Sequence, residues 1–103
     1  MRASAKAQLA RVWEAHHAAP FPAELYDVPS GVDIVKVDAA ITGCASSLLG
    51  SGQFAEKGHG RVLRRCLEEV RDVLPLVQSA EARQYCERLL ALGQTARDFV
   101  EGR

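Results

Sequence analysis

The sequence predicts an all-α protein, a small bundle of four main helices with a proline-rich crossing between the first and the second. Three observations support this class. Apolar residues recur at alternating spacings of three and four nearly throughout, and prolines and glycines separate the stripes. The 103 residues, 48% hydrophobic and 25% charged, suffice for one modest core. We therefore expect a single domain, residues 1–103, with helices at about 3–18, 31–49, 60–74 and 80–101.

The first helix and the crossing follow from spacing and from proline chemistry. The first stripe has 4-3-4 spacing and consists of Ala5, Leu9, Val12 and His16. Prolines at 20, 22 and 29 then end the helix and impose an extended crossing, because proline lacks a backbone N–H and restricts the residue before it. Pro22 suits the first position of a single turn through Tyr26. The expected anchors of the crossing are Phe21, Leu25 and Tyr26.

The second helix has a recognisable start and a long stripe. Ser30 to Asp33 matches a capping box, with Ser30 as the predicted N-cap. The inward residues are Ile34, Val37, Ile41, Cys44 and Leu48. A strand over residues 32–37 competes because β-branched residues are frequent there, but the stripe continues too far for a typical strand. Gly50, Ser51 and Gly52 are expected to end the helix, and residues 54–60 to form a loop.

The third and fourth helices are bounded by capping signals. The third is expected to point Val62, Leu63, Cys66, Leu67, Val70, Val73 and Leu74 inward and to end at Pro75. Ser79 is a favourable N-cap for the fourth, and Gly102 is its stop. The stripe of the fourth helix comprises Ala82, Tyr85, Leu89, Leu92, Ala96 and Phe99.

The adjacent histidines of the segment WEAHHAAPFP first suggest a metal site. Neighbouring helix residues point about 100° apart, whereas chelation from one helix requires i, i+3 or i, i+4 spacing. We therefore expect His16 and His17 to end a helix rather than to bind metal. His16 lies on the core stripe, and our hypothesis is that it lines a polar pocket under the crossing together with Trp13 and Tyr26.

Other candidate chemistry is weak, and we expect no catalytic residue, metal or cofactor. The three cysteines, Cys44, Cys66 and Cys86, fit no zinc-binding spacing, so buried packing is favoured over a thiolate metal site. Asp33 and Asp38 are five residues apart, which places them on different faces of a helix. The glycines match no phosphate-binding loop. Enzymatic activity is therefore disfavoured.

The charge balance limits the partners. Thirteen basic residues offset thirteen acidic ones, so nucleic-acid binding is disfavoured. The basic cluster Arg61, Arg64, Arg65 and Arg71 is followed by acids, which predicts the ion pairs Arg64–Glu68 and Arg65–Glu69. The longest uncharged run, 39–55, contains glycines and serines and is too short to span a membrane. We expect a cytoplasmic protein, and arginine-rich, asparagine-free coding is typical of GC-rich bacteria.

A face of small residues distinguishes the second helix. Ala39, Gly43 and Ser47 recur at i, i+4 and i+8. Glycine destabilises a helix interior by about 1 kcal/mol relative to alanine, so Gly43 suggests a close approach of another backbone. Tight packing inside the monomer, a homodimer contact and the floor of a narrow pocket all remain open.

Two functions of different classes follow. The first is a non-enzymatic protein-interaction or regulatory module that self-associates as a homodimer, because broad apolar faces in so small a chain can leave a stripe exposed. The alternative is a small-molecule-binding bundle or accessory enzyme with its pocket under the 20–30 crossing.

Overall fold

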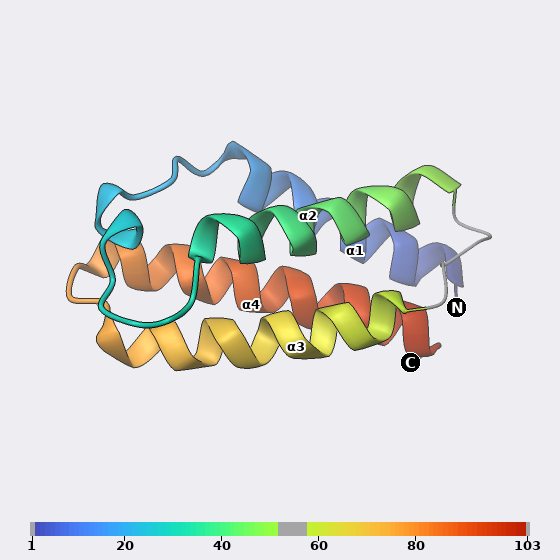
Figure 1. The fold of residues 1–103 in the computed structure, drawn as a ribbon. Coiled ribbons are helices and arrows are strands. Elements are labelled where there is room, and N and C mark those ends of the chain that lie inside the picture. Colours follow the sequence, from blue (N-terminus) through green and yellow to red (C-terminus); the bar gives the residue numbers. More distant parts are fainter. Residues whose placement is uncertain (1, 52–57, 103) are drawn as a thin grey trace.

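The computed structural model describes residues 2–51 and 58–102, with the side chains of residues 4–50 and 58–102. Four α-helices form a bundle (Figure 1), and the described residues contain no strand. This confirms the predicted all-α class. The elements are α1 (Arg2–Ala18), a 3-10 turn η1 (Ala23–Tyr26), α2 (Ile34–Ser51), α3 (His59–Val73), a 3-10 turn η2 (Leu74–Leu76) and α4 (Ala80–Glu101).

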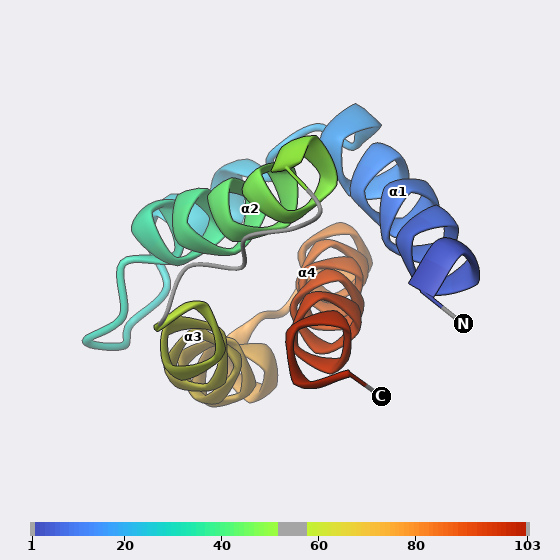
Figure 2. The same ribbon diagram turned by 90° about the vertical axis from the view of Figure 1, so that its right-hand side faces the viewer.

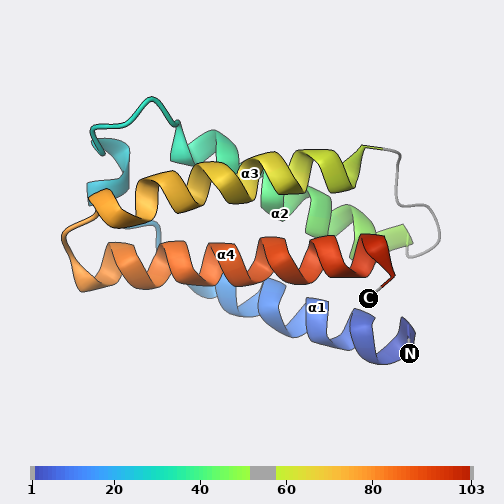
Figure 3. The same cartoon turned by 90° about the horizontal axis from the view of Figure 1, so that it is seen from below.

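The helices alternate in direction along the bundle, so that each runs opposite to its neighbour in the sequence (Figure 1). In the view along the bundle, α4 lies between α1 and α3, and α2 covers it (Figure 2). Seen from below, α3 and α4 lie side by side over most of their length (Figure 3). Helix α4 therefore contacts all three other helices, which agrees with its continuous buried stripe.

The crossing is anchored at the positions expected from sequence, with one exception. Leu25 is buried in η1, and Phe21 is half-buried against the core. Tyr26 is 67% exposed, so the prediction that it anchors the crossing is wrong. A polar anchor accompanies Leu25: the Glu24 carboxylate accepts the backbone N–H groups of Gln78 at 2.6 Å and Ser79 at 2.9 Å. This clamp fastens the crossing to the α3–α4 connection.

Helix α2 begins three residues later than predicted. Asp33, not Ser30, caps it, since Asp33 Oδ1 accepts the N–H groups of Val35 at 3.1 Å and Lys36 at 3.3 Å. Ser30 Oγ instead accepts the N–H of Val32 in the preceding turn. Both Ser and Asp are good N-caps, and the side chain nearer the first buried residue provides the cap. The helix also continues through Gly50 to Ser51 rather than ending at Gly50.

The remaining helix ends agree closely with expectation. Ser79 Oγ accepts the N–H of Ala82 at 3.0 Å, and Gly102 ends α4 with a φ of 76° in the left-handed region that favours glycine. Helix α3 starts at His59, after Gly58 with a φ of 106°, and a 3-10 turn follows it at Pro75. The predicted loop at 54–60 lies partly outside the described residues.

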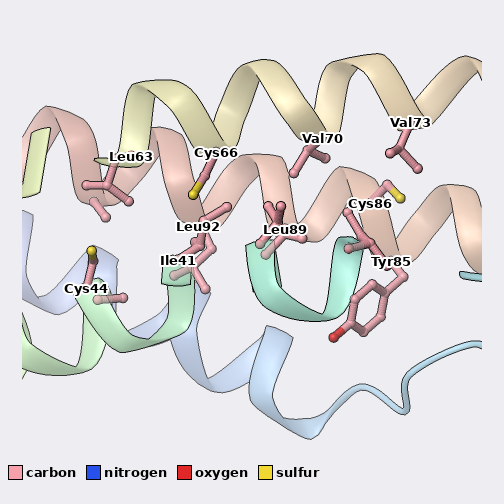
Figure 4. Packing of buried hydrophobic residues seen from close by; sticks show 14 of the residues in the cluster. Ile41, Cys44, Leu63, Cys66, Val70, Val73, Tyr85, Cys86, Leu89 and Leu92 are labelled. Atoms are coloured by element: carbon pink, nitrogen blue, oxygen red, sulfur yellow. The ribbon is translucent and has the colours of Figure 1, made fainter. Parts of the chain in front are cut away.

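The core is a continuous apolar cluster between α2, α3 and α4, which α1 extends (Figure 4). All predicted inward residues of α2 and α4 are buried. In α3, Val62 is 41% exposed and Leu74 is half-buried, so the predicted apolar face was too wide. The three cysteines are free thiols and are buried, as expected for small apolar side chains.

Gly93 lies where α4 packs closely against α2 and α3 in the core. A Cβ at this position would lie 2.7 Å from Leu67 Cδ2 and 3.5 Å from Ile41 Cδ1. Helix α4 can therefore approach α2 and α3 only because residue 93 has no side chain. No helix within residues 2–51 and 58–102 has the length and apolarity required to cross a membrane.

Candidate functional site: a buried His–Asp–Tyr cluster

A polar cluster lies where α1, α2 and α4 meet at one end of the core. His16 Nε2 and Asp38 Oδ1 are 2.9 Å apart, and the Tyr85 hydroxyl donates to Asp38 Oδ2. Because an ionised carboxylate only accepts hydrogen bonds, His16 Nε2 carries the proton that it shares with Asp38. Each oxygen of Asp38 therefore has one donor, from two different helices.

The local sequence explains how three polar groups reach one point. His16 and Tyr85 occupy positions on the buried stripes of α1 and α4, at 3% and 4% exposure. Asp38 lies beside the α2 stripe, next to Val37, and its side chain is 16% exposed. A buried imidazole or phenol without a partner is costly, so the carboxylate that flanks the core compensates both.

Aromatic rings surround the cluster. The His16 and Tyr85 ring centroids are 4.7 Å apart, and Phe21 from the crossing meets the edge of Tyr85 at 5.2 Å. Figure 4 shows Tyr85 at one end of the row of buried side chains. The crossing thus closes this end of the bundle over the tyrosine.

The electrostatics of the cluster favour a neutral phenol. Burial, followed by the hydrogen bond to Asp38 and the negative charge of Asp38, raises the pKa of Tyr85 well above its ordinary value. The Arg88 guanidinium, 6.0 Å from the centre of the Tyr85 ring, acts in the opposite direction but is the weaker influence. Tyr85 is therefore a hydrogen-bond donor to Asp38 over the physiological pH range.

Three buried polar atoms in or beside the cluster have no hydrogen-bond partner among the described residues. They are His16 Nδ1, Trp13 Nε1 and Arg88 Nε. Trp13 stacks on His17, with centroids 4.6 Å apart and planes 9° from parallel. The outer histidine of the pair thus packs against the indole, while the inner one faces the carboxylate.

A shallow depression opens on the α2 side of the cluster. Its polar lining comes from His16, His17, Asp38, Thr42 and Tyr85. Thr42 Oγ1 donates to the Asp38 carbonyl oxygen at 2.9 Å, which leaves little free hydrogen-bonding capacity there. Both carboxylate oxygens of Asp38 have a donor, whereas His16 Nδ1 has no partner among the described residues.

The structure does not bring Trp13, His16 and Tyr26 together in one cavity. His16 lines the depression, whereas Trp13 stacks on His17 and is not among the lining residues. Tyr26 packs on Phe21, with centroids 4.9 Å apart, and borders a different depression at the start of α2. Asp38 and Tyr85 were not predicted from the sequence to lie beside His16. The sequence did contain one indication of this contact. A histidine on an apolar stripe, such as His16, requires a hydrogen-bond partner, and Asp38 is the last charged residue before the uncharged part of α2.

The small-residue face of α2 points outward. Ala39, Gly43 and Ser47 are all exposed, and a Cβ added at Gly43 would meet nothing within 4 Å. Tight packing of this face inside the monomer is therefore excluded. The homodimer contact remains a prediction, and Ala39 alone of the three borders the His16 depression.

The remaining predictions concern metal binding, the cysteine thiols and the ion pairs of α3. No group of three or more His, Cys, Asp and Glu side chains in the described chain could hold a metal ion. Burial raises the pKa of all three thiols, that of Cys86 to about 11, which makes them poor nucleophiles. The predicted ion pairs of α3 are not formed within 4 Å among these residues. Arg64 instead donates to the Gly60 carbonyl oxygen at 3.4 Å.

Comparison of the chain with protein-family models, with curated proteins and with solved structures finds no match in any of the three.

Proposed function

We propose that this protein is a non-enzymatic interaction or regulatory module that self-associates through the outer face of α2. The outer face is defined here by Ala39, Gly43 and Ser47. The observation that carries the proposal is that all three are exposed and small, in a part of the helix that has no charged residue from Ala39 to Ser51. The chain has 25% charged residues, and none of them lies on this face.

Small residues favour association because they allow a second helix backbone to approach closely. No ion has to be desolvated along the outer face, so the electrostatic cost of covering it is low. The exposed Val35, one turn before Ala39, adds apolar surface at its end.

Substitution of Gly43 tests this proposal. The Gly43→Arg variant is expected to remain folded, because the added side chain enters open space, and to lose self-association at least tenfold. Analytical ultracentrifugation over a concentration series measures the association, and circular dichroism measures the fold. Ala91→Arg is the matched control, since Ala91 is an exposed small residue of α4. A wild-type chain that stays monomeric throughout would overturn the proposal.

The second candidate is a small-molecule-binding bundle, and the specific observation in its favour is the convergence of His16, Asp38 and Tyr85 on one depression. Titration with a library of small polar aromatic compounds, followed by NMR signals of the histidine rings, tests it. Binding should weaken in Asp38→Asn. The absence of saturable binding by any compound would count against this function.

A further inference from the structure

The His16 depression, which lies on the α2 side of the His–Asp–Tyr cluster, is large enough for a small ligand. Its volume is about 320 Å³, at the lower end of the range of about 300–1,000 Å³ that is typical of ligand pockets. Val35, Ala39 and Ala19 supply its apolar lining, beside the five polar side chains already named. The hydrogen-bonding capacity of those polar side chains determines which ligand the depression can hold.

The polar side chains of the depression use their hydrogens within the protein. His16 Nε2 and the Tyr85 hydroxyl both donate to the Asp38 carboxylate. The Thr42 hydroxyl donates to the backbone of its own helix, at 2.9 Å to the Asp38 carbonyl oxygen. The hydrogen-bonding capacity that remains at the carboxylate and at the Thr42 and Tyr85 oxygens therefore consists of acceptor lone pairs. In the same tautomer the buried His16 Nδ1 is an acceptor too.

The depression also carries a negative charge that no lysine or arginine neutralises. Asp38 is the one acidic residue of its lining. Among the described residues, no Lys or Arg nitrogen lies within 4 Å of the Asp38 carboxylate. Arg88, whose guanidinium is 6.0 Å from the centre of the Tyr85 ring, does not line the depression. Since the Asp38 side chain is 16% exposed and belongs to the lining, a ligand can approach it from solvent.

We infer that the His16 depression binds a primary amine in its ammonium form. An ammonium group has three donors and no acceptor, which complements a lining that offers acceptors and a negative charge. Thr42 follows Asp38 by one turn on the same face of α2, so its hydroxyl oxygen is a second acceptor beside the carboxylate. An anion would be repelled by Asp38, and a neutral alcohol would leave its charge uncompensated.

Other cations fit the site less well. A guanidinium pairs best as a planar fork with two free carboxylate oxygens, but each oxygen of Asp38 already has a donor. A metal ion requires several ligating side chains, and no group of three or more His, Cys, Asp and Glu side chains in the described chain could hold one. A compact ammonium group needs only the remaining lone pairs.

The apolar lining favours an amine with a hydrocarbon or aromatic tail. Val35 is 44% exposed, and Ala39, one turn later on α2, is exposed as well. Covering these side chains removes apolar surface from water, which favours binding. The inference rests on the second candidate function, the small-molecule-binding bundle, and does not depend on self-association.

Three ligands that differ in one group test the charge requirement on the unaltered chain. Phenethylamine, phenethyl alcohol and hydrocinnamate share a phenyl ring and a two-carbon linker, and they end in an ammonium, a hydroxyl and a carboxylate group. NMR titration that follows the histidine and tyrosine ring signals gives each Kd. The amine should bind about tenfold or more tightly than the alcohol, because hydrogen bonds to charged groups are the stronger ones. Hydrocinnamate should show no saturable binding.

Two variants test the position of the ammonium group. Asp38→Asn removes the charge and should weaken phenethylamine binding about tenfold or more. Thr42→Val removes one acceptor and should weaken it about threefold. This second variant should fold as the wild type does, because the Thr42 hydroxyl bonds only to its own helix. Asp72→Asn alters an exposed aspartate of α3 outside the lining, and as the matched control it should bind like the wild type.

The results distinguish a wrong ligand class from a wrong function. If phenethylamine binds no more tightly than phenethyl alcohol, or fails to bind while another compound does, the ammonium inference is wrong and small-molecule binding stands. If neither these three compounds nor any member of the library binds saturably, the inference and the second candidate function both fail. Unchanged phenethylamine binding in Asp38→Asn and Thr42→Val would overturn the placement of the ammonium group.

Discussion

The two helices that flank α4 are held by different interactions. Helix α3 packs through five buried residues: Leu63, Cys66, Leu67, Val70 and Val73. Among the described side chains of α1, the buried ones are Leu9 and His16, and only half-buried residues accompany them. Helix α3 therefore docks through an apolar stripe, whereas α1 depends on a polar contact, between His16 and Asp38, at its C-terminal end.

The difference shows how a small chain can assemble a bundle from helices of unequal apolarity. Apolar packing is non-directional and roughly proportional to the area removed from water, so it attaches α3 strongly but specifies its position mainly by shape. A hydrogen bond has a narrow geometry, and its net contribution to stability is smaller. We infer that the His16–Asp38–Tyr85 cluster positions α1, while Leu9 and the half-buried residues supply its apolar contact.

The largest expected effect on stability tests the apolar packing between α3 and α4. Gly93→Leu should lower the free energy of unfolding by about 3 kcal/mol, because overpacking a filled core forces neighbouring side chains and backbone apart. The clash is with Leu67, which is fully buried and cannot move into solvent. Urea denaturation measures the loss. Gly43→Leu, which adds the same side chain in open space, should change the value by less than about 1 kcal/mol.

The next effect tests the polar attachment of α1. His16→Leu should cost about 2–3 kcal/mol, since it leaves the partly buried Asp38 without one of its two donors. In the double variant with Asp38→Asn the loss should be smaller than the sum of the two single losses, because each variant removes the same interaction. A double-mutant cycle by urea denaturation gives the coupling. A neutral or stabilising His16→Leu would show that packing alone holds α1.

The smallest effect concerns the crossing that connects α1 to α2. The Ser79 hydroxyl and the N–H groups of Gln78 and Ser79 lower the pKa of Glu24 below its ordinary value of 4.5. A carboxyl group with a lowered folded-state pKa contributes stability above its unfolded-state pKa, and this contribution is lost as pH falls through the folded-state pKa.

Glu24→Gln should therefore flatten the decrease in stability between about pH 5 and the folded-state pKa of Glu24. Thermal unfolding at a series of pH values measures the slope, with Glu81→Gln as a control for an exposed carboxylate of the same region. An unchanged slope would show that the clamp contributes nothing to folding.

Helix positions and the core were largely predictable, for identifiable reasons. The stripes of α2 and α4 repeat over five or six inward residues, which is long enough to exclude a strand, and Ser79 and Gly102 mark the ends of α4 without competition. The start of α2 was predicted less well, because Ser30 and Asp33 are both chemically suitable caps. The exposure of Val62 was also not predictable. Periodicity shows which face of a helix a residue lies on, but it does not show how far the neighbouring helix covers that face.

The local pattern of the chain was sufficient to specify four helices, a proline-enforced crossing and most of the buried residues, because these depend on spacing and on backbone chemistry within a few positions. The partners of His16 were decided only in three dimensions. Asp38 is 22 residues from His16 and 47 residues from Tyr85 along the chain. The periodicity within one helix does not show which residues of another helix it will contact. The same is true of the outward direction of Gly43 and the close contact at Gly93, because the packing angle of the helices determines which glycine another helix approaches.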